Sequence, residues 1–114
     1  MWKVFSDPFM NDSKVFPTQQ KDVKKIIDAY SKDSNVTKLI IFGSSVTSAC
    51  NPWSDIDLYA ELIENKNLPN VGLQDVSLDA WTNYTVDSAL MQEINKKGVV
   101  VYERNIAGHG EYAV

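Results

Sequence analysis

One segment constrains the fold of this chain more than any other: residues 43–59, in which a Gly43-Ser44 turn precedes the aspartates Asp55 and Asp57. Ile56 separates the two aspartates, and side chains on a β-strand alternate between the two faces of a sheet. Both carboxylates are therefore predicted on one face, with Ile56 on the other. Mg²⁺ takes one or two protein carboxylates and completes its shell with water and phosphate oxygens. The pattern thus predicts a strand that supplies half of a site for metal-bound phosphate.

The residues before and after Gly43 are predicted to supply the other half of this phosphate site. Residues 38–42 form a short apolar run bounded by turn residues, which predicts a buried strand. Glycine lets the backbone approach a ligand closely, and successive N–H groups at Gly43, Ser44 and Ser45 form a concavity that binds anions. The Asn51-Pro52 turn signal lets the chain reverse direction, so that the two strands lie side by side. Phosphate is the natural ligand of such a turn.

The Gly43-Ser44 turn followed by Ser54-Asp55-Ile56-Asp57-Leu58 resembles the signature of the DNA polymerase beta superfamily of nucleotidyltransferases. It is most similar to the smallest branch, the minimal nucleotidyltransferases with antitoxin-like MNT domains, from the helix before Lys38 to Tyr102. The resemblance implies an α+β fold in two layers, a mixed β-sheet of about four strands with helices packed on one face. It also implies that Gly43, Ser44, Ser45 and Ser54 bind the nucleotide.

The chain departs from its relatives directly after this turn. Many relatives carry an arginine or another basic residue after Gly-Ser, where this chain has Ser45, Val46 and Thr47. Part of the positive charge that neutralises phosphate is therefore missing here or is supplied by another segment.

The resemblance implies a third carboxylate on a neighbouring strand, and residues 74–81 offer two. Their alternating pattern places Asp75 and Asp79 on the same face. Asp79 is preferred because apolar Leu78 and Ala80 flank it, as they flank the third aspartate of the family. Asp75, nearer the start of the strand, remains the alternative.

The resemblance implies that Asp55, Asp57 and Asp79 are the catalytic residues and the metal ligands. Two Mg²⁺ ions about 3.5–4 Å apart would stabilise the entering and leaving oxygens of an in-line displacement. The resemblance implies that the substrate is a nucleoside triphosphate, with ATP expected, and that a nucleoside monophosphate is transferred to a hydroxyl acceptor. Asp79 has a second role open to it, as the general base that takes the proton of the acceptor.

The acceptor and the partner follow only from the family. Its minimal members often work with a small helical partner of the HEPN type, as antitoxins that nucleotidylate that toxin on tyrosine. A homodimer is a further expectation. Two other functions stay open: an antitoxin of an MNT/HEPN pair that acts by binding alone, and a nucleotide-binding pseudoenzyme, which the missing basic residue favours.

Composition limits the partners and the compartment. The 114 residues predict one domain, with an N-terminal extension over 1–16 and a mobile tail over 106–114. The net charge of −4 argues against a nucleic-acid acceptor, since nucleic-acid surfaces need clustered Lys and Arg. The absence of an 18-residue apolar stretch and of a signal-like N-terminus predicts no membrane span and no secretion. The single cysteine, Cys50, fits a reducing cytoplasm.

The remaining elements follow from periodicity and from turn signals. A helix is predicted from Pro17 to about Ser31, with apolar residues at helical spacing on one side. Residues 61–72 form a polar connection just long enough to cross over to a parallel strand. A second helix is predicted from an N-cap at Asp87 to the Gly98 signal, followed by a buried strand over 99–102.

Overall fold

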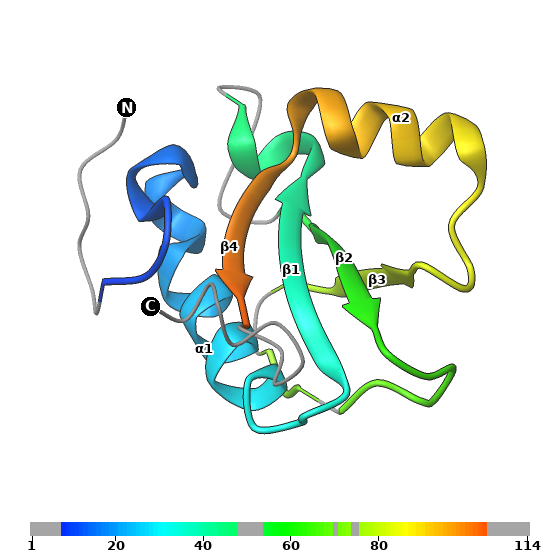
Figure 1. Cartoon of the computed structure of the whole chain (residues 1–114). Coiled ribbons are helices and arrows are strands. Elements are labelled where there is room, and N and C mark those ends of the chain that lie inside the picture. Colours follow the sequence, from blue (N-terminus) through cyan, green and yellow to red (C-terminus); the bar gives the residue numbers. More distant parts are fainter. Residues whose placement is uncertain (1–7, 48–53, 70, 74–75, 105–114) are drawn as a thin grey trace, which may run out of the picture.

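The computed structural model describes residues 8–47, 54–69, 71–73 and 76–104, and Figure 1 shows their arrangement. Its helices are α1 (Gln20–Tyr30) and α2 (Ser88–Lys97). Its strands are β1 (Val36–Phe42), β2 (Ile56–Leu62), β3 (Leu78–Thr82) and β4 (Val99–Glu103). Three short 3₁₀ turns complete it: η1 (Asp12–Lys14), η2 (Pro17–Gln19) and η3 (Gly43–Val46). Every helix and strand predicted from the sequence is present among these residues.

The strands of the described residues form one four-stranded sheet in the order β3-β2-β1-β4. Strand β1 is antiparallel to β2 and to β4, whereas β2 and β3 are parallel. The connection after Leu62 therefore crosses over to a parallel strand, as its length predicts. The α+β class and the mixed sheet are confirmed.

Helix α1 covers one face of the sheet. Its apolar stripe is fully or almost fully buried, because residues three and four apart lie on the same side of a helix. It packs against alternate residues of the two central strands, among them Leu39, Ile41, Ile56 and Leu58. This is the larger part of the hydrophobic core.

Helix α2 lies on the opposite face, which differs from the predicted packing of the helices on one face. Ile94 of α2 is 1% exposed and packs with Ile40, Phe42 and Tyr59. The reason lies in β1, where residues 39–42 are apolar without alternation, so each face of the strand presents apolar side chains. Both faces of β1 therefore need a cover, and each helix provides one.

The sequence before α1 belongs to the core. Val15 is fully buried in the α1 cluster, and Phe9 packs against the same cluster. The backbone N–H of Phe16 donates to the carbonyl of Ser45 at 2.7 Å, which attaches this segment to η3. Residues 8–16 of the predicted extension thus pack on the fold, while residues 1–7 and the predicted tail over 106–114 lie outside the described residues.

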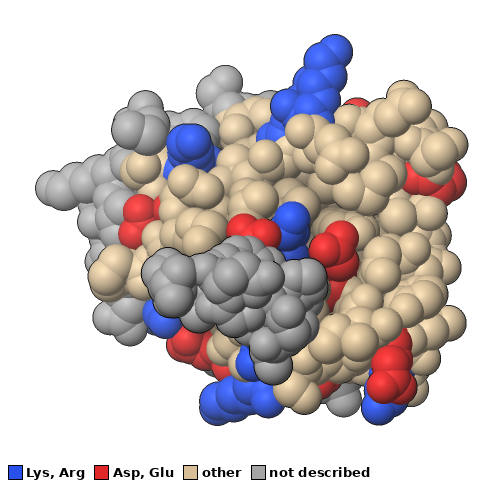
Figure 2. Space-filling model, in the orientation of Figure 1, with Lys and Arg blue, Asp and Glu red and all other residues tan. Residues whose placement is uncertain are grey.

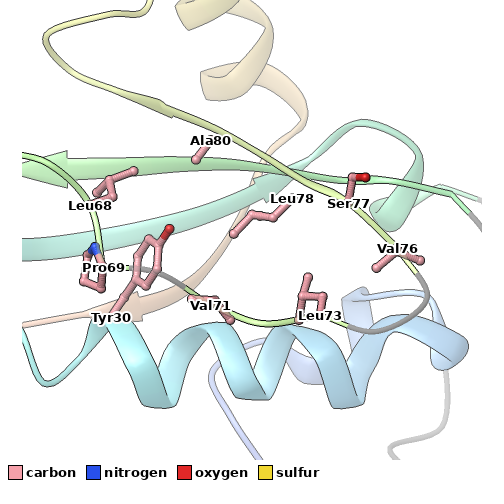
Figure 3. Close-up of a pocket in the computed structure, with 9 residues that line it drawn as sticks. All are labelled: Tyr30, Leu68, Pro69, Val71, Leu73, Val76, Ser77, Leu78 and Ala80. Carbon is pink, nitrogen blue, oxygen red and sulfur yellow. The ribbon is translucent and has the colours of Figure 1, made fainter.

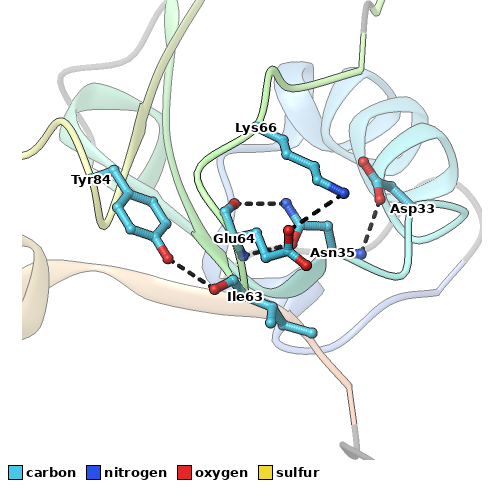
Figure 4. Close-up of polar contacts among 6 residues, drawn as sticks. All are labelled: Asp33, Asn35, Ile63, Glu64, Lys66 and Tyr84. Atoms are coloured by element: carbon cyan, nitrogen blue, oxygen red, sulfur yellow. Dashed lines mark hydrogen bonds and ion pairs between the residues drawn. The ribbon is translucent and has the colours of Figure 1, made fainter.

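Asparagine side chains hold the end of β2 that is farthest from Asp57. Asn35 donates to the carbonyl of Glu64 and accepts from its N–H, at 2.9 and 2.7 Å (Figure 4). Asn83 makes the same pair of bonds with Leu62, at 3.1 and 2.9 Å. Tyr84 donates to Ile63 beside them. These bonds fix where β2 ends, and so help to hold the strand on which Asp57 lies.

The helices of the described ranges include none that is both long enough and apolar enough to cross a lipid bilayer.

Candidate active site

Asp57 and Asp79 lie side by side on parallel strands. Each is the second residue of its strand, and the two are paired in the register of β2 and β3. Ile56 and Leu58 are fully buried against α1, so alternation along the strand turns Asp57 to the α2 face. Leu78 packs against the same α1 cluster, so Asp79, the next residue of β3, also faces the α2 side. Since adjacent strands are about 4.8 Å apart, the two carboxylates share one small space.

Asp55 lies just before β2, at the same end of the sheet. Its Oδ1 accepts a hydrogen bond from the N–H of Ser77 at 3.3 Å. The N–H of Ile56 donates to the carbonyl of Ser77 at 2.9 Å, which extends the pairing of the two strands in this direction. Asp55 therefore borders the space that Asp57 and Asp79 share, but its carboxylate is directed to the backbone before β3.

Gly43 brings the turn into direct contact with Asp57. Gly43 has a φ of +73°, a conformation that costs glycine little and other residues more. A Cβ atom built on Gly43 would collide with the Oδ2 atom of Asp57. The contact follows from the sheet, because Phe42, the last residue of β1, pairs with Asp57. The predicted meeting of turn and carboxylate is thus a feature of the fold.

A cavity of about 550 Å³ opens beside this contact. Its walls come from η3 and the residue after it on one side and from α2 on the other. The lining residues are Gly43, Ser44, Val46, Thr47, Glu93 and Lys97. This volume lies within the range of small-molecule sites in proteins, about 300–1,000 Å³. The turn, the carboxylates and the cavity together have the parts of a site for a phosphorylated ligand.

A family model described as polymerase beta, nucleotidyltransferase, matches residues 24–107 of the chain. The chain belongs to this family. The match extends from α1 through β4 and includes the Gly-Ser turn and all of the predicted carboxylates. No curated protein sequence is a significant match to the chain.

Electrostatic repulsion marks the group of carboxylates at this end of the sheet. Partial burial raises the pKa of Asp57 above its ordinary value, and the negative charges of Asp79, Asp55 and Glu93 raise it further. The ion pairs among the described residues join Lys24 to Asp28, Lys38 to Glu103 and Lys66 to Glu64, and none of these pairs includes Asp57, Asp79, Asp55 or Glu93. A bound cation would relieve this repulsion.

Glu93 is a site residue that the sequence analysis missed. It lies on α2, close enough to Asp57 to raise the pKa of that carboxylate, and it lines the cavity. Leu90 and Ile94, which pack on the sheet, mark the docked side of α2, and Glu93 precedes Ile94. The sequence offered one signal for Glu93, its place next to a residue of the apolar side of the predicted helix. That signal points to the active site only if α2 covers the same face of the sheet as the carboxylates, which the sequence analysis did not predict.

The predicted nucleotide-binding serines take different positions. Ser44 lines the cavity, whereas Ser45 is fully buried and its hydroxyl donates to the side-chain oxygen of Gln19. The amide nitrogen of Gln19 donates in turn to the carbonyl of Ser54 at 2.5 Å. The Ser45 side chain therefore supports the turn from the protein interior and does not face the cavity. Asp75, the alternative third carboxylate, lies outside the described residues.

The donor set has the chemistry of a magnesium site, because it consists of carboxylates beside a turn that binds anions. Asp57 and Asp79 are the pair whose positions fit a shared cation. Over the residues that the structure describes, however, no three His, Cys, Asp or Glu side chains are grouped so that they could hold a metal ion. Asp55 would have to leave the Ser77 N–H to join the pair.

A second cleft, of about 530 Å³, lies on the other face of the sheet, between α1, β3 and the crossover (Figure 3). Its lining residues are Tyr30, Leu68, Pro69, Val71, Leu73, Val76, Ser77, Leu78 and Ala80. Most are apolar, and the described residues of this lining include no carboxylate and no basic residue. The sheet separates this cleft from Asp57 and Asp79, so it is not the candidate active site.

Proposed function

We propose that this protein transfers a nucleoside monophosphate from a nucleoside triphosphate, with ATP as the expected substrate, to a hydroxyl group in a Mg²⁺-dependent reaction. One observation carries the proposal: Gly43 is in contact with Asp57, and Asp57 is in register with Asp79. An anion-binding turn and a pair of carboxylates therefore meet at one place. Phosphate alone would be repelled by these carboxylates, whereas phosphate bound to a divalent cation suits both groups.

The proposed roles follow from position. Asp57 and Asp79, with Asp55, would hold Mg²⁺, which would supply a Lewis acid that binds phosphate oxygens and lowers the pKa of an attacking hydroxyl. The N–H groups of the Gly43-Ser44 turn receive a phosphate. The hydroxyl oxygen forms a bond to the α-phosphorus, and the bond from that phosphorus to the pyrophosphate oxygen breaks. Asp79, which is exposed, can accept the hydroxyl proton.

A hydroxyl on a partner protein is the acceptor that we favour, with a small helical partner of the HEPN type as the family-based candidate. The net charge of −4 supports this choice over a nucleic-acid end. On the face that Figure 2 shows, the Lys and Arg side chains of the described residues occur singly among acidic and uncharged ones. A nucleic-acid surface would gather them into a patch.

Transfer of label from a triphosphate tests the proposal. The full chain is incubated with Mg²⁺, each of the four nucleoside triphosphates labelled at the α-phosphate, and extracts that contain candidate acceptors. We expect a labelled product together with pyrophosphate, both lost with EDTA and in Asp57→Asn, and both retained in Asp28→Asn, an exposed carboxylate on α1. Equal labelling by wild type and Asp57→Asn would contradict the proposal.

A nucleotide-binding pseudoenzyme is the second candidate, and one observation favours it. The described carboxylates do not form a group of three that could hold a metal ion. Such a protein would bind Mg²⁺ and triphosphate yet release no pyrophosphate with any acceptor. The same labelling experiment therefore separates the two functions.

A further inference from the structure

The turn at Gly43 lacks the positive charge that a triphosphate calls for. Ser44, Ser45, Val46 and Thr47 are uncharged, and the nearby carboxylates are negative. A triphosphate that enters this site brings several negative charges, of which bound Mg²⁺ neutralises only a part. The source of the remaining positive charge is a question that rests on the proposed function.

Among the described residues that line the cavity beside the turn, one is basic, Lys97 of α2. It lines the cavity opposite Ser44 and Thr47. The backbone there is fixed: Ile94 is buried against the sheet, and the N–H of Gly98 donates to the carbonyl of Ile94 at 2.7 Å. A Cβ on Gly98 would lie 2.5 Å from Ile40, so the helix end and β1 are in close contact. Lys97 therefore projects from a rigid part of the protein.

Along α2, an acidic residue lies near Asp57 and a basic residue lies one turn further on. Glu93 is among the charges that raise the pKa of Asp57, and Lys97, one turn further on, lines the same cavity. Residues at this spacing have Cβ atoms about 5–6 Å apart on one side of a helix. The carboxylate end of the cavity and its basic end are thus separated by about one helical turn.

We propose that Lys97 binds the β- and γ-phosphates of the triphosphate, and that it supplies from α2 the positive charge that the Gly-Ser turn lacks. The ion pairs formed among the described residues do not include Lys97, so its ammonium group needs to break none of them. The polyphosphate would lie along the cavity, with its metal-bound part at Asp57 and its distal part at Lys97. Lysine suits this role as a compact point charge.

A structural role for Lys97 is the competing explanation. Lys96 and Lys97 both lie in the last turn of α2, where positive side chains stabilise a helix through its dipole. Lys96 shares that role but does not line the cavity. It is therefore the matched control, and glutamine, a good helix former without charge, is the suitable replacement at both positions.

The test compares Lys97→Gln, Lys97→Arg and Lys96→Gln in the full chain. Calorimetry measures the affinity for ATP, for inorganic tripolyphosphate and for AMP, each with Mg²⁺, and thermal unfolding verifies that each variant is folded. We expect Lys97→Gln to weaken binding of ATP and tripolyphosphate about ten-fold or more, the usual scale for a lost charged hydrogen bond. Affinity for AMP stays unchanged, Lys97→Arg keeps most of the affinity, and Lys96→Gln resembles wild type.

Three outcomes would overturn the proposal, and they differ in what they mean for the proposed function. If Lys97→Gln binds ATP as Lys96→Gln does, while Asp57→Asn still loses Mg²⁺-dependent binding, Lys97 has no role and the proposed function stands. An equal loss of affinity for AMP and for ATP in Lys97→Gln would also show that Lys97 does not bind the β- and γ-phosphates, because a structural effect lowers both affinities. If wild type binds neither ATP nor tripolyphosphate and transfers no label, the proposed function fails together with this inference.

Discussion

At Gly43 the backbone and the carboxylate of Asp57 are so close that only glycine fits. The residue has a positive φ, and its missing side chain leaves the space that Oδ2 of Asp57 occupies. Position 43 therefore has two independent requirements: a backbone with positive φ, and no Cβ atom in the space that Oδ2 of Asp57 occupies. Any side chain at this position would strain the turn and displace Asp57.

We predict that Gly43→Ala lowers the free energy of unfolding by about 1–3 kcal/mol through the backbone alone, and by more through the clash. Urea unfolding measures the change. Gly72→Ala is the control, because an added Cβ there meets open space. In an Asp57→Ala background the cost of Gly43→Ala should fall, since the clashing oxygen is gone. Equal costs in both backgrounds would show that Asp57 does not crowd Gly43.

The raised pKa of Asp57 predicts how stability depends on pH. The largest cause is burial, which disfavours the charged carboxylate in the folded state. Repulsion by Asp79, Asp55 and Glu93 disfavours it further. Between the pKa of Asp57 in the unfolded chain, about 3.9, and its higher pKa in the folded protein, the folded state binds more protons. The free energy of unfolding therefore falls as pH rises through that interval, and it stays lower above it.

Without divalent metal, Asp57→Asn should raise the free energy of unfolding at pH 7, and the gain should shrink toward pH 4. Urea titrations in EDTA at the two pH values measure this, with Asp28→Asn as the control. Added Mg²⁺ should stabilise wild type but not Asp57→Asn, because a ligand that binds only the folded state stabilises it. A destabilised Asp57→Asn at pH 7 in EDTA would contradict the repulsion that we describe.

At the scale of elements, the turn η3 separates two neighbouring serines that look alike in the sequence. Ser44 lines the cavity, and Ser45 points into the protein, where its hydroxyl meets Gln19. Both follow Gly43, and both were predicted to bind nucleotide. The sequence could not separate them, because the partner of Ser45 comes from η2, far away in the chain.

This division predicts opposite effects of two small changes. Ser45→Ala leaves the buried side-chain oxygen of Gln19 without its donor, which should cost about 1–3 kcal/mol of unfolding free energy. Ser44→Ala should change stability by less than about 0.5 kcal/mol and should weaken triphosphate binding. Chemical denaturation and calorimetry measure the two quantities. If Ser44→Ala is the more destabilising change, our assignment of the two side chains is reversed.

The strands show what a local pattern can predict and what it cannot. In β2, alternation around Asp57 was sufficient to predict that Ile56 and Leu58 are buried on one face while Asp57 lies on the other. In β1, the unbroken apolar run predicted burial but carried no information on which element covers each face. The position of α2, and with it Glu93 and Lys97, depends on tertiary packing around Ile94. The face on which Asp57 lies was therefore predictable, whereas the residues that α2 contributes were not.

For the whole molecule, the mixed sheet is what assembles the site. Because β2 and β3 are parallel, the beginnings of both strands lie at one end of the sheet, and Asp57 and Asp79 meet there. Because β1 is antiparallel to β2, its last residue, Phe42, delivers Gly43 to the same end. Helix α2 then covers this face and adds a wall to the cavity. The topology thus gathers groups from four separate parts of the chain.

The most direct test of this account is the binding of Mn²⁺, as a paramagnetic substitute for Mg²⁺, together with a non-hydrolysable triphosphate. Electron paramagnetic resonance measures the unbound ion in titrations of wild type, Asp57→Asn, Asp79→Asn, Asp75→Asn and Asp28→Asn. We predict that Asp57→Asn and Asp79→Asn each weaken Mn²⁺ binding at least about ten-fold, and that Asp75→Asn and Asp28→Asn do not. Unchanged binding in Asp57→Asn and Asp79→Asn would contradict the account.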